Sequence, residues 1–267
     1  MFNSKDISIE KFNLKIFQSD LFPEELQHLF STRLGGDTPA PLDSFTLSAK
    51  DYSLFENYAK SNVKKVCSII GANAEKIVQP NQQHTDKIAI VRTDEDLKII
   101  TNEPFDGVIT NLKNVPVLLV FADCIPVLIY DKKQKVLACV HAGWKGTAQR
   151  ISQKAILNMV EYFQSNVNDI LVAIGPGIGQ ECFEVNKDVS AQLGMSIKTD
   201  YGNIFLENND KVHVDLKLLN KIQIQELGVE EVDICDCCTC CNNNIFYSYR
   251  ADNKITGRHG MLAMIKE

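Results

Sequence analysis

The sequence predicts an α+β fold in which helices cover a mixed β-sheet. Short β-prone runs recur along the chain, some apolar on both faces like buried strands and others alternating between apolar and polar residues. Amphipathic stretches with apolar residues at intervals of three and four separate some of these runs. The gaps mix hairpin lengths with helix-length crossovers, which favours a mixed sheet over a regular doubly wound one. No repeat or Gly/Ser/Pro linker divides the 267 residues, so we expect a single domain over 1–267.

Three stretches are predicted to be helices. In the first, residues 51–70, the apolar side chains keep helical spacing and Gly71 follows as a C-terminal stop. The second follows Thr147 and runs from 151 to 163 with its apolar residues on one face, and the third spans 215–227 before Gly228. The predicted strands are, in chain order, 87–92, 107–110, 115–121, 127–130, 136–141, 170–174, 245–250 and 260–265.

Composition and charge exclude several classes of protein. Hydrophobic residues make up 45% of the chain and charged residues 23%, which is typical of a globular protein. The formal charge is -6 and no basic run stands out, so we expect no nucleic-acid partner. The longest apolar stretch is broken by Pro116, Asp123 and Pro126, so no membrane span is expected. The first residues have neither the basic region nor the apolar core of a secretory signal, and the expected location is cytoplasmic.

The nine cysteines are an odd number in a chain without an export signal, which favours reduced thiols, metal ligands or a nucleophile over disulfides. Five of them lie within residues 235–241. A zinc ribbon needs two C-x-x-C pairs about 15 to 20 residues apart, and this chain has no second pair at that distance. We therefore favour a redox-sensitive loop or partly buried free thiols here, with a structural metal as the alternative.

Three good metal ligands lie at the ends of predicted strands. His84 precedes a strand, Cys124 lies in the break between two strands, and His141 ends one. Two imidazoles and one thiolate form a sensible zinc set with a fourth position open to water or substrate, although their separations of 40 and 17 residues are not those of a zinc finger. The alternative for each residue is an ordinary hydrogen-bonded histidine or a small buried cysteine.

The residues around these ligands add chemical groups. Asp123 is a charge within an apolar strand pair, where burial is unfavourable unless the charge is paired or functional. Gly143 and Gly146 precede a helix and offer free N–H groups to a phosphate, or form an ordinary strand-to-helix turn. Arg33 lies beside two glycines and could clamp an anion or be solvated. The cations of segments 246–250 and 256–259 are expected to close the same cleft.

Taken in this order, the segments resemble the laccase-domain family, the multicopper polyphenol oxidase-like family of bacterial purine nucleoside phosphorylases. The resemblance spans nearly the whole chain. The matching segments are 30–36, 81–84, 106–110, 122–127, 141–147, 175–179, 182–185, 238–239, 247–250 and 256–258. Three departures are Thr85 in place of a glycine, Ala251 in place of a second arginine, and a changed pattern at 45–48.

The resemblance implies a single-domain α/β/β/α sandwich with mixed sheets and a catalytic zinc held by His84, Cys124 and His141. It implies a glycosyltransferase, a purine nucleoside phosphorylase that uses phosphate on adenosine, inosine and methylthioadenosine and also deaminates adenosine. Copper binding in vitro is a further possibility, and we expect a monomer or homodimer. The residues that we expect to contact substrate are Arg33, Asn81, Lys145 and Arg250.

On this hypothesis Asp123 moves the required proton, or instead supports a ligand histidine. Three other interpretations stay open. One is a copper-loaded phenol oxidase, although the chain has only five histidines. Another is a metal-free hydrolase with Cys124 as nucleophile and His141 as base. The third is a thiol-rich interaction protein that uses the cysteines of 235–241.

Overall fold

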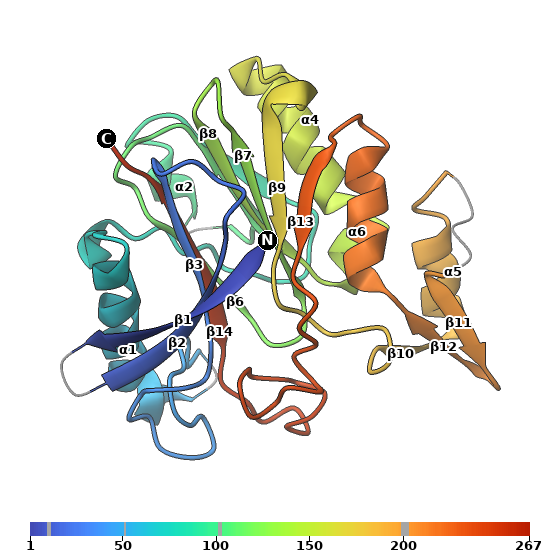
Figure 1. Cartoon of the computed structure of the whole chain (residues 1–267), viewed down its shortest axis with the longest axis horizontal. Helices are drawn as coiled ribbons and strands as arrows, with labels where there is room; N and C mark the ends of the chain where they lie inside the picture. Colours follow the sequence, from blue (N-terminus) through green and yellow to red (C-terminus); the bar gives the residue numbers. More distant parts are fainter. Residues whose placement is uncertain (10–11, 51, 101–102, 199–202) are drawn as a thin grey trace.

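The computed structural model describes residues 1–9, 12–50, 52–100, 103–198 and 203–267, and these form four stacked layers (Figure 1). Helix α1 (Glu56–Ile69) covers a five-stranded sheet, which packs on a six-stranded sheet, and helices α4 (Ile151–Phe163) and α6 (Leu216–Gln225) cover the far side. This is the α/β/β/α sandwich that the resemblance implied, and the α+β prediction is confirmed. None of the described helices is long and apolar enough to cross a bilayer.

The two large sheets differ in strand direction. The five-stranded sheet is antiparallel throughout, whereas the six-stranded sheet has a parallel pair at each edge. The strand order of the first is β1 (Phe2–Ile9), β2 (Phe12–Ser19), β3 (Leu26–Ser31), β14 (His259–Ile265) and β6 (Val117–Phe121). The order of the second is β13 (Glu231–Ile234), β9 (Ile170–Ile174), β7 (Ile125–Asp131), β8 (Val136–Ala142), β5 (Gly107–Thr110) and β4 (Ile88–Val91).

A small antiparallel sheet and short helices complete the structure. The sheet has the order β10 (Glu184–Asn186), β12 (Lys211–Val214) and β11 (Phe205–Asn208). It lies beside α5 (Lys187–Gly194), at the right of Figure 1. The remaining short helices are α2 (Leu97–Ile100) and α3 (Trp144–Ala148), with 3-10 turns at Ser53–Phe55, Ala74–Lys76 and Val167–Asp169.

Side chains that point alternately to the two faces of each strand form three large apolar cores between the layers. In β14, Met261 and Ala263 are buried between the two large sheets, while Leu262 and Met264 are buried on the face covered by α1. Successive side chains of a strand point to opposite faces, so one apolar strand supplies two cores. The third core lies between the six-stranded sheet and helices α4 and α6.

The predicted helices are confirmed. The second has the bounds of α4, and the third contains α6, whose N-cap Asp215 accepts a hydrogen bond from the Leu218 N–H (2.9 Å). The first contains α1, and Gly71 adopts a left-handed φ of 68° just beyond its end. Asp51, the predicted start of that helix, lies outside the described residues.

The strand predicted at 245–250 is wrong, because this segment forms turns. Its aromatic residues Phe246 and Tyr247 are fully buried as anchors of a loop. The Tyr247 hydroxyl donates to the Leu42 carbonyl (2.7 Å) and accepts from the Phe45 N–H (3.0 Å). Tertiary contacts of these rings, rather than strand pairing, therefore account for the apolar pattern.

The sequence analysis does not predict strands β1 to β3. Strand β1 is mostly exposed and polar, so it lacks the apolar pattern of a strand.

Candidate active site

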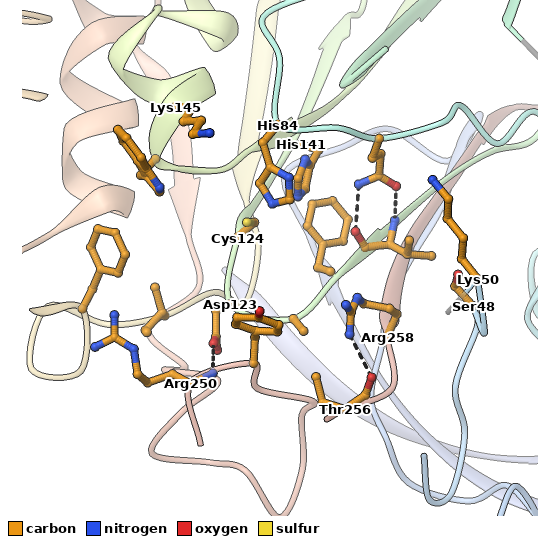
Figure 2. Close-up of a pocket in the computed structure, with 18 of the residues that line it drawn as sticks. Ser48, Lys50, His84, Asp123, Cys124, His141, Lys145, Arg250, Thr256 and Arg258 are labelled. Carbon is orange, nitrogen blue, oxygen red and sulfur yellow. Dashed lines mark hydrogen bonds between the residues drawn. The ribbon is translucent and has the colours of Figure 1, made fainter. Parts of the chain in front are cut away.

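The three predicted ligands converge at one end of the six-stranded sheet (Figure 2). Strands β7 and β8 are antiparallel with Pro126 opposite His141, so Cys124, just before β7, lies next to the end of β8. His84 reaches the same point from the loop before β4. The metal-binding atoms of His84, Cys124 and His141 all lie within 4.8 Å of one another. The two imidazole rings are 5.0 Å apart between centroids and nearly perpendicular.

Asp106 holds the loop that carries His84. Its carboxylate accepts hydrogen bonds from the backbone N–H groups of Gln83 (3.2 Å), His84 (3.0 Å) and Thr85 (2.6 Å). His84 has a φ of 58°, a left-handed conformation that is unfavourable for a residue with a side chain. Such a conformation persists when the surrounding contacts over-determine it, and the three hydrogen bonds do so. The Thr85 hydroxyl also donates to Asp106 (2.8 Å), a bond that a glycine at this position cannot make.

Gln82 joins the loop that carries His84 to the five-stranded sheet. Its side-chain amide donates to the Val120 carbonyl (2.8 Å), and its amide oxygen accepts from the Val120 N–H (2.9 Å). Val120 is in β6, so the loop is fastened to both large sheets. Gln82, the first of the two glutamines in the segment 81–84, therefore positions His84 two residues later.

Asp106 also sets the orientation of His141. His141 Nδ1 lies 2.7 Å from Asp106 Oδ1, and both residues are buried. With the Nδ1 proton donated to the carboxylate, Nε2 is left as the ligand atom. Burial raises the pKa of Asp106, but hydrogen bonds from His141 and Thr85 outweigh it and lower the pKa to about 2. Asp106 begins the segment 106–110, which is part of the family resemblance, but nothing in the sequence indicates that it supports a histidine.

Cys124 and His141 shift each other's pKa. Burial raises the pKa of the Cys124 thiol, but the adjacent His141 and His84 imidazoles lower it overall to about 6. Burial lowers the pKa of His141, and Cys124 together with Asp106 raises it overall to about 9. A thiolate is the form of cysteine that binds metals and attacks electrophiles.

Gly143 leaves room for the ligand cluster. A Cβ at this position would lie 3.0 Å from His84 Cδ2 and 3.1 Å from Cys124 Sγ. Both distances are shorter than ordinary van der Waals contacts, so any larger residue presses on His84 and Cys124, two of the three predicted ligands. Gly143 also precedes α3, whose residues Trp144 and Lys145 line the adjoining cavity.

Asp123 lies beside the cluster and joins two distant segments. It has a left-handed φ of 84° and is almost fully buried. One carboxylate oxygen accepts from the Thr239 hydroxyl (2.7 Å) and the other from the Arg250 N–H (2.7 Å), as Figure 2 shows for Arg250. Asp106, rather than Asp123, is the carboxylate that hydrogen-bonds to His141, one of the predicted ligands.

A cavity of about 1160 Å³ opens from the three ligands. Its lining is rich in cations although the whole chain has a formal charge of -6. The cationic lining residues are Lys50, Lys145, Lys211, Arg250 and Arg258. The aromatic ones are Tyr52, Phe121, Trp144, Phe183 and Tyr249. Positive charge with flat apolar faces is suited to an anion together with a planar ring system.

The structure brings three of the four predicted substrate contacts to this cavity. Asn81, Lys145 and Arg250 line it, and Arg258 lies there too, near Thr256 and Lys50 in Figure 2. Arg33 is not among the lining residues. Its guanidinium donates to the Asn243 carbonyl (3.0 Å), pairs with Asp252 (3.4 Å) and lies over the Tyr247 ring.

Comparison with known proteins decides the family. The sequence model of the family described as multi-copper polyphenol oxidoreductase laccase matches residues 27–266. The chain belongs to this laccase family. Purine nucleoside phosphorylase YfiH of Escherichia coli (strain K12) is 30% identical over 241 residues, which are 88% of this chain and 92% of that protein. The adenosine deaminase RL5 of an unknown prokaryotic organism is 28% identical over 198 residues, 71% of this chain and 75% of that protein.

A longer relative and a solved structure extend the comparison. The mouse purine nucleoside phosphorylase LACC1 is 28% identical over 91% of this chain, but the chain spans only 56% of that longer protein. The crystal structure of the hypothetical protein YfiH of Bacillus licheniformis covers 97% of this chain and 100% of its own with a TM-score of 0.87 and 27% identity. The four-layer fold is therefore shared with a solved structure.

Proposed function

We propose that this laccase-family protein is a zinc-dependent purine nucleoside phosphorylase that acts on adenosine, inosine and methylthioadenosine and also deaminates adenosine. The observation that carries the proposal is that one cavity joins the cluster of His84, Cys124 and His141 to cationic and aromatic side chains. The names of the relatives, purine nucleoside phosphorylase and adenosine deaminase, support the same conclusion.

The ligand cluster fits Zn²⁺. Two imidazoles and a low-pKa thiolate are typical of catalytic zinc sites, and the Asp106 carboxylate behind His141 is a frequent outer partner. His84, Cys124 and His141 would hold the ion, which supplies Lewis-acid chemistry at an open coordination position.

The protein's own side chains bind and orient the substrates. Lys145, Arg250 and Arg258 attract phosphate, and Trp144 and Phe183 offer apolar faces to the purine. In phosphorolysis a phosphate oxygen bonds to C1′ of the sugar, and the purine nitrogen leaves with the electron pair of the broken bond and takes up a proton. Positive side chains around the phosphate hold it near C1′ as charge develops on the sugar.

Asp123 is proposed to position Arg250 rather than to transfer the proton. Both of its oxygens accept hydrogen bonds, from Thr239 and from the Arg250 backbone. The guanidinium of Arg250 is in turn held by the carbonyls of Cys182 (2.9 Å) and Glu184 (3.1 Å). These contacts fix one cationic wall of the cavity.

Release of free purine base from adenosine and inosine, with and without phosphate, tests the phosphorylase. The wild type should release base only with phosphate, and Cys124→Ala should lose turnover together with the zinc held by His84, Cys124 and His141. Cys67→Ala is the matched control, because Cys67 is a buried residue of α1 in a different core. Full activity in Cys124→Ala, or no release by the wild type loaded with zinc, would overturn the proposal.

Conversion of adenosine to inosine without phosphate tests the deaminase. The product carries an oxygen in place of the amino group, and one ammonia is released for each inosine formed. Loss of both activities in Cys124→Ala would support a shared site. Deamination that survives in this variant would separate the two reactions.

A metal-free hydrolase is the second candidate, because Cys124 is polarised by an adjacent histidine in the manner of a nucleophile and base. Its test is hydrolysis of activated esters by chelated protein, with iodoacetamide as the inhibitor. Activity that rises on metal removal favours the hydrolase.

Oxygen uptake with a phenol after copper loading tests the oxidase activity in the family's name.

A further inference from the structure

A second cluster of metal-binding side chains lies outside the candidate active site. It comprises Glu181, Cys182, Cys238 and Cys241, whose ligand atoms all lie within 4.8 Å of one another. Cys182 Sγ is 3.4 Å from Cys241 Sγ, which is 3.3 Å from Glu181 Oε1. None of these four residues belongs to the cluster of His84, Cys124 and His141.

The cluster forms where two segments far apart in sequence run side by side. The chain after β9 and the chain after β13 are joined by a bridge between Gly177 and Cys238, and the Thr239 N–H donates to the Gly177 carbonyl (3.2 Å) (Figure 1). The first segment contributes an adjacent glutamate and cysteine, and the second contributes a C-x-x-C pair. The sequence alone did not indicate this ligand set, because the two segments are 59 residues apart.

The sulfur of Cys238 is placed as a ligand thiolate would be. Cys238 is buried, and its Sγ accepts from the N–H groups of Gly179 (3.1 Å) and Cys241 (3.4 Å). Two backbone donors on one sulfur are the kind of outer hydrogen bonding that supports a metal-binding side chain. At Gly179 a Cβ would lie 2.4 Å from Glu181 Oε1, so the glycine lets the carboxylate fold back toward the cysteines.

The ligand atoms of this second cluster favour a particular kind of metal ion. Three thiolates, two of them at C-x-x-C spacing, and one carboxylate suit a tetrahedral, soft-ligand ion, of which Zn²⁺ is the common case. A divalent ion would leave this set with two net negative charges. The buried Lys217 ammonium, from α6, donates to the carbonyls of Cys235 (2.8 Å) and Cys237 (3.3 Å) and places one positive charge against the cysteine-rich segment.

The cluster is connected to the wall of the active-site cavity. Arg250 is held by the carbonyl of Cys182, and Phe183 and Glu184, the next two residues, line the cavity. On the other segment, Thr239 follows Cys238 and donates to Asp123. An ion bound here would therefore fix both segments that position Arg250.

We propose that Glu181, Cys182, Cys238 and Cys241 form a second, structural zinc site that ties the loop after β9 to the cysteine-rich segment and so supports the cavity wall. This site does not depend on the proposed reaction, since its evidence is the donor set and its connections. It also gives a role to part of the cluster 235–241 that the active site does not use.

Counting zinc in variants that lack the first site tests the proposal. Cys124→Ala, exchanged into zinc and passed through dilute chelator, should retain about one zinc per chain. Adding Cys241→Ser should remove it, whereas adding Cys237→Ser should not, because Cys237 is in the same segment but outside the four ligands. Cobalt in place of zinc should give thiolate charge-transfer absorption in Cys124→Ala that Cys241→Ser abolishes.

The outcomes separate this site from the proposed function. Zinc is counted without nucleoside, so an inactive phosphorylase leaves the result unchanged. Loss of all zinc from a folded Cys124→Ala, or equal zinc content with and without Cys241→Ser, would overturn the second site. Hydrogen exchange provides a further check, because backbone N–H groups of 179–184 should exchange more slowly in the zinc-loaded than in the chelated Cys124→Ala protein.

Discussion

His141 Nδ1 lies 2.7 Å from Asp106 Oδ1, and the same carboxylate accepts the N–H groups of the loop that carries His84. One buried acid therefore positions two proposed ligands, His84 and His141, that belong to different segments of the chain. Hydrogen bonding to a ligand histidine fixes its tautomer and ring orientation and raises its basicity. The affinity of the site for metal should accordingly depend on a residue that does not touch the metal.

Asp106→Asn should weaken zinc binding about 10- to 100-fold, because an amide supports the His141 ring less well than a carboxylate. Competition with a zinc chelator measures the affinity. Asp96→Asn is the matched control, since Asp96 also accepts two backbone N–H groups in a turn but is only half-buried and does not line the cavity. Equal zinc affinity in Asp106→Asn and the wild type, with both folded, would contradict the assigned role.

Gly143→Ala should disturb the ligand cluster, because the new methyl group lies 3.0 Å from His84 and 3.1 Å from Cys124. Relieving such an overlap typically costs about 1–3 kcal/mol, which here should appear as weaker zinc binding. Gly194→Ala is a suitable comparison, as its Cβ would meet nothing closer than Phe205 at 3.9 Å. Similar zinc affinities for the two variants would show that the cluster adapts to the extra group.

Lys145→Ala should raise the KM for phosphate about tenfold, the loss expected for one charge-assisted contact, with little change in stability. Lys145 is exposed, lines the cavity and lies over the Trp144 ring. Lys145→Arg keeps the charge and should restore much of the phosphate affinity. A raised KM for nucleoside with an unchanged KM for phosphate would assign Lys145 to the other substrate.

Arg33→Ala should instead destabilise the fold. The Arg33 guanidinium is mostly buried and bonded to the Asn243 carbonyl and Asp252, so its removal should lower the free energy of unfolding by about 2 kcal/mol. Denaturant unfolding measures the loss, and steady-state kinetics at low temperature should show a KM for phosphate close to that of the wild type. A selective rise in that KM without destabilisation would return Arg33 to the substrate site.

Stability should fall in mild acid because His28 is buried in its neutral form. The Ser19 N–H donates to His28 Nε2 (3.1 Å), and burial lowers the His28 pKa to about 4. Below the unfolded pKa of about 6.5 the unfolded chain takes up a proton that the folded chain does not. Between pH 7 and pH 5 this should remove about 2 kcal/mol of stability.

The matched variant for this pH dependence is His28→Gln, which keeps a polar side chain but does not titrate. Its free energy of unfolding should fall less steeply between pH 7 and pH 5 than that of the wild type. His259 is also fully buried, with a pKa lowered by burial to about 3, and contributes in the same direction to both proteins. Parallel pH curves for the two proteins would exclude His28 as a source of the acid sensitivity.

Much of the fold follows from local periodicity in the sequence. Helical spacing predicts α4 and α6, and continuous apolar runs predict the central strands β7, β8 and β9, because these elements bury faces that their own residues define. The polar strand β1 is mostly exposed and gives little of this signal. Residues 245–250 have the apolar pattern of a strand but form turns. The pattern arises because Phe246 and Tyr247 are buried individually as anchors of the loop.

The residue types of the candidate metal site also follow from the sequence, because few side chains bind metals and His84, Cys124 and His141 stand at or near strand ends. Tertiary structure alone decided which distant residues support them. It brought Asp106 to His141 across 35 positions, kept Arg33 outside the cavity, and joined Cys182 to Cys241. The physical reason is that chain folding closes long loops by burying apolar faces, and the polar groups that meet as a result leave no local pattern in the sequence.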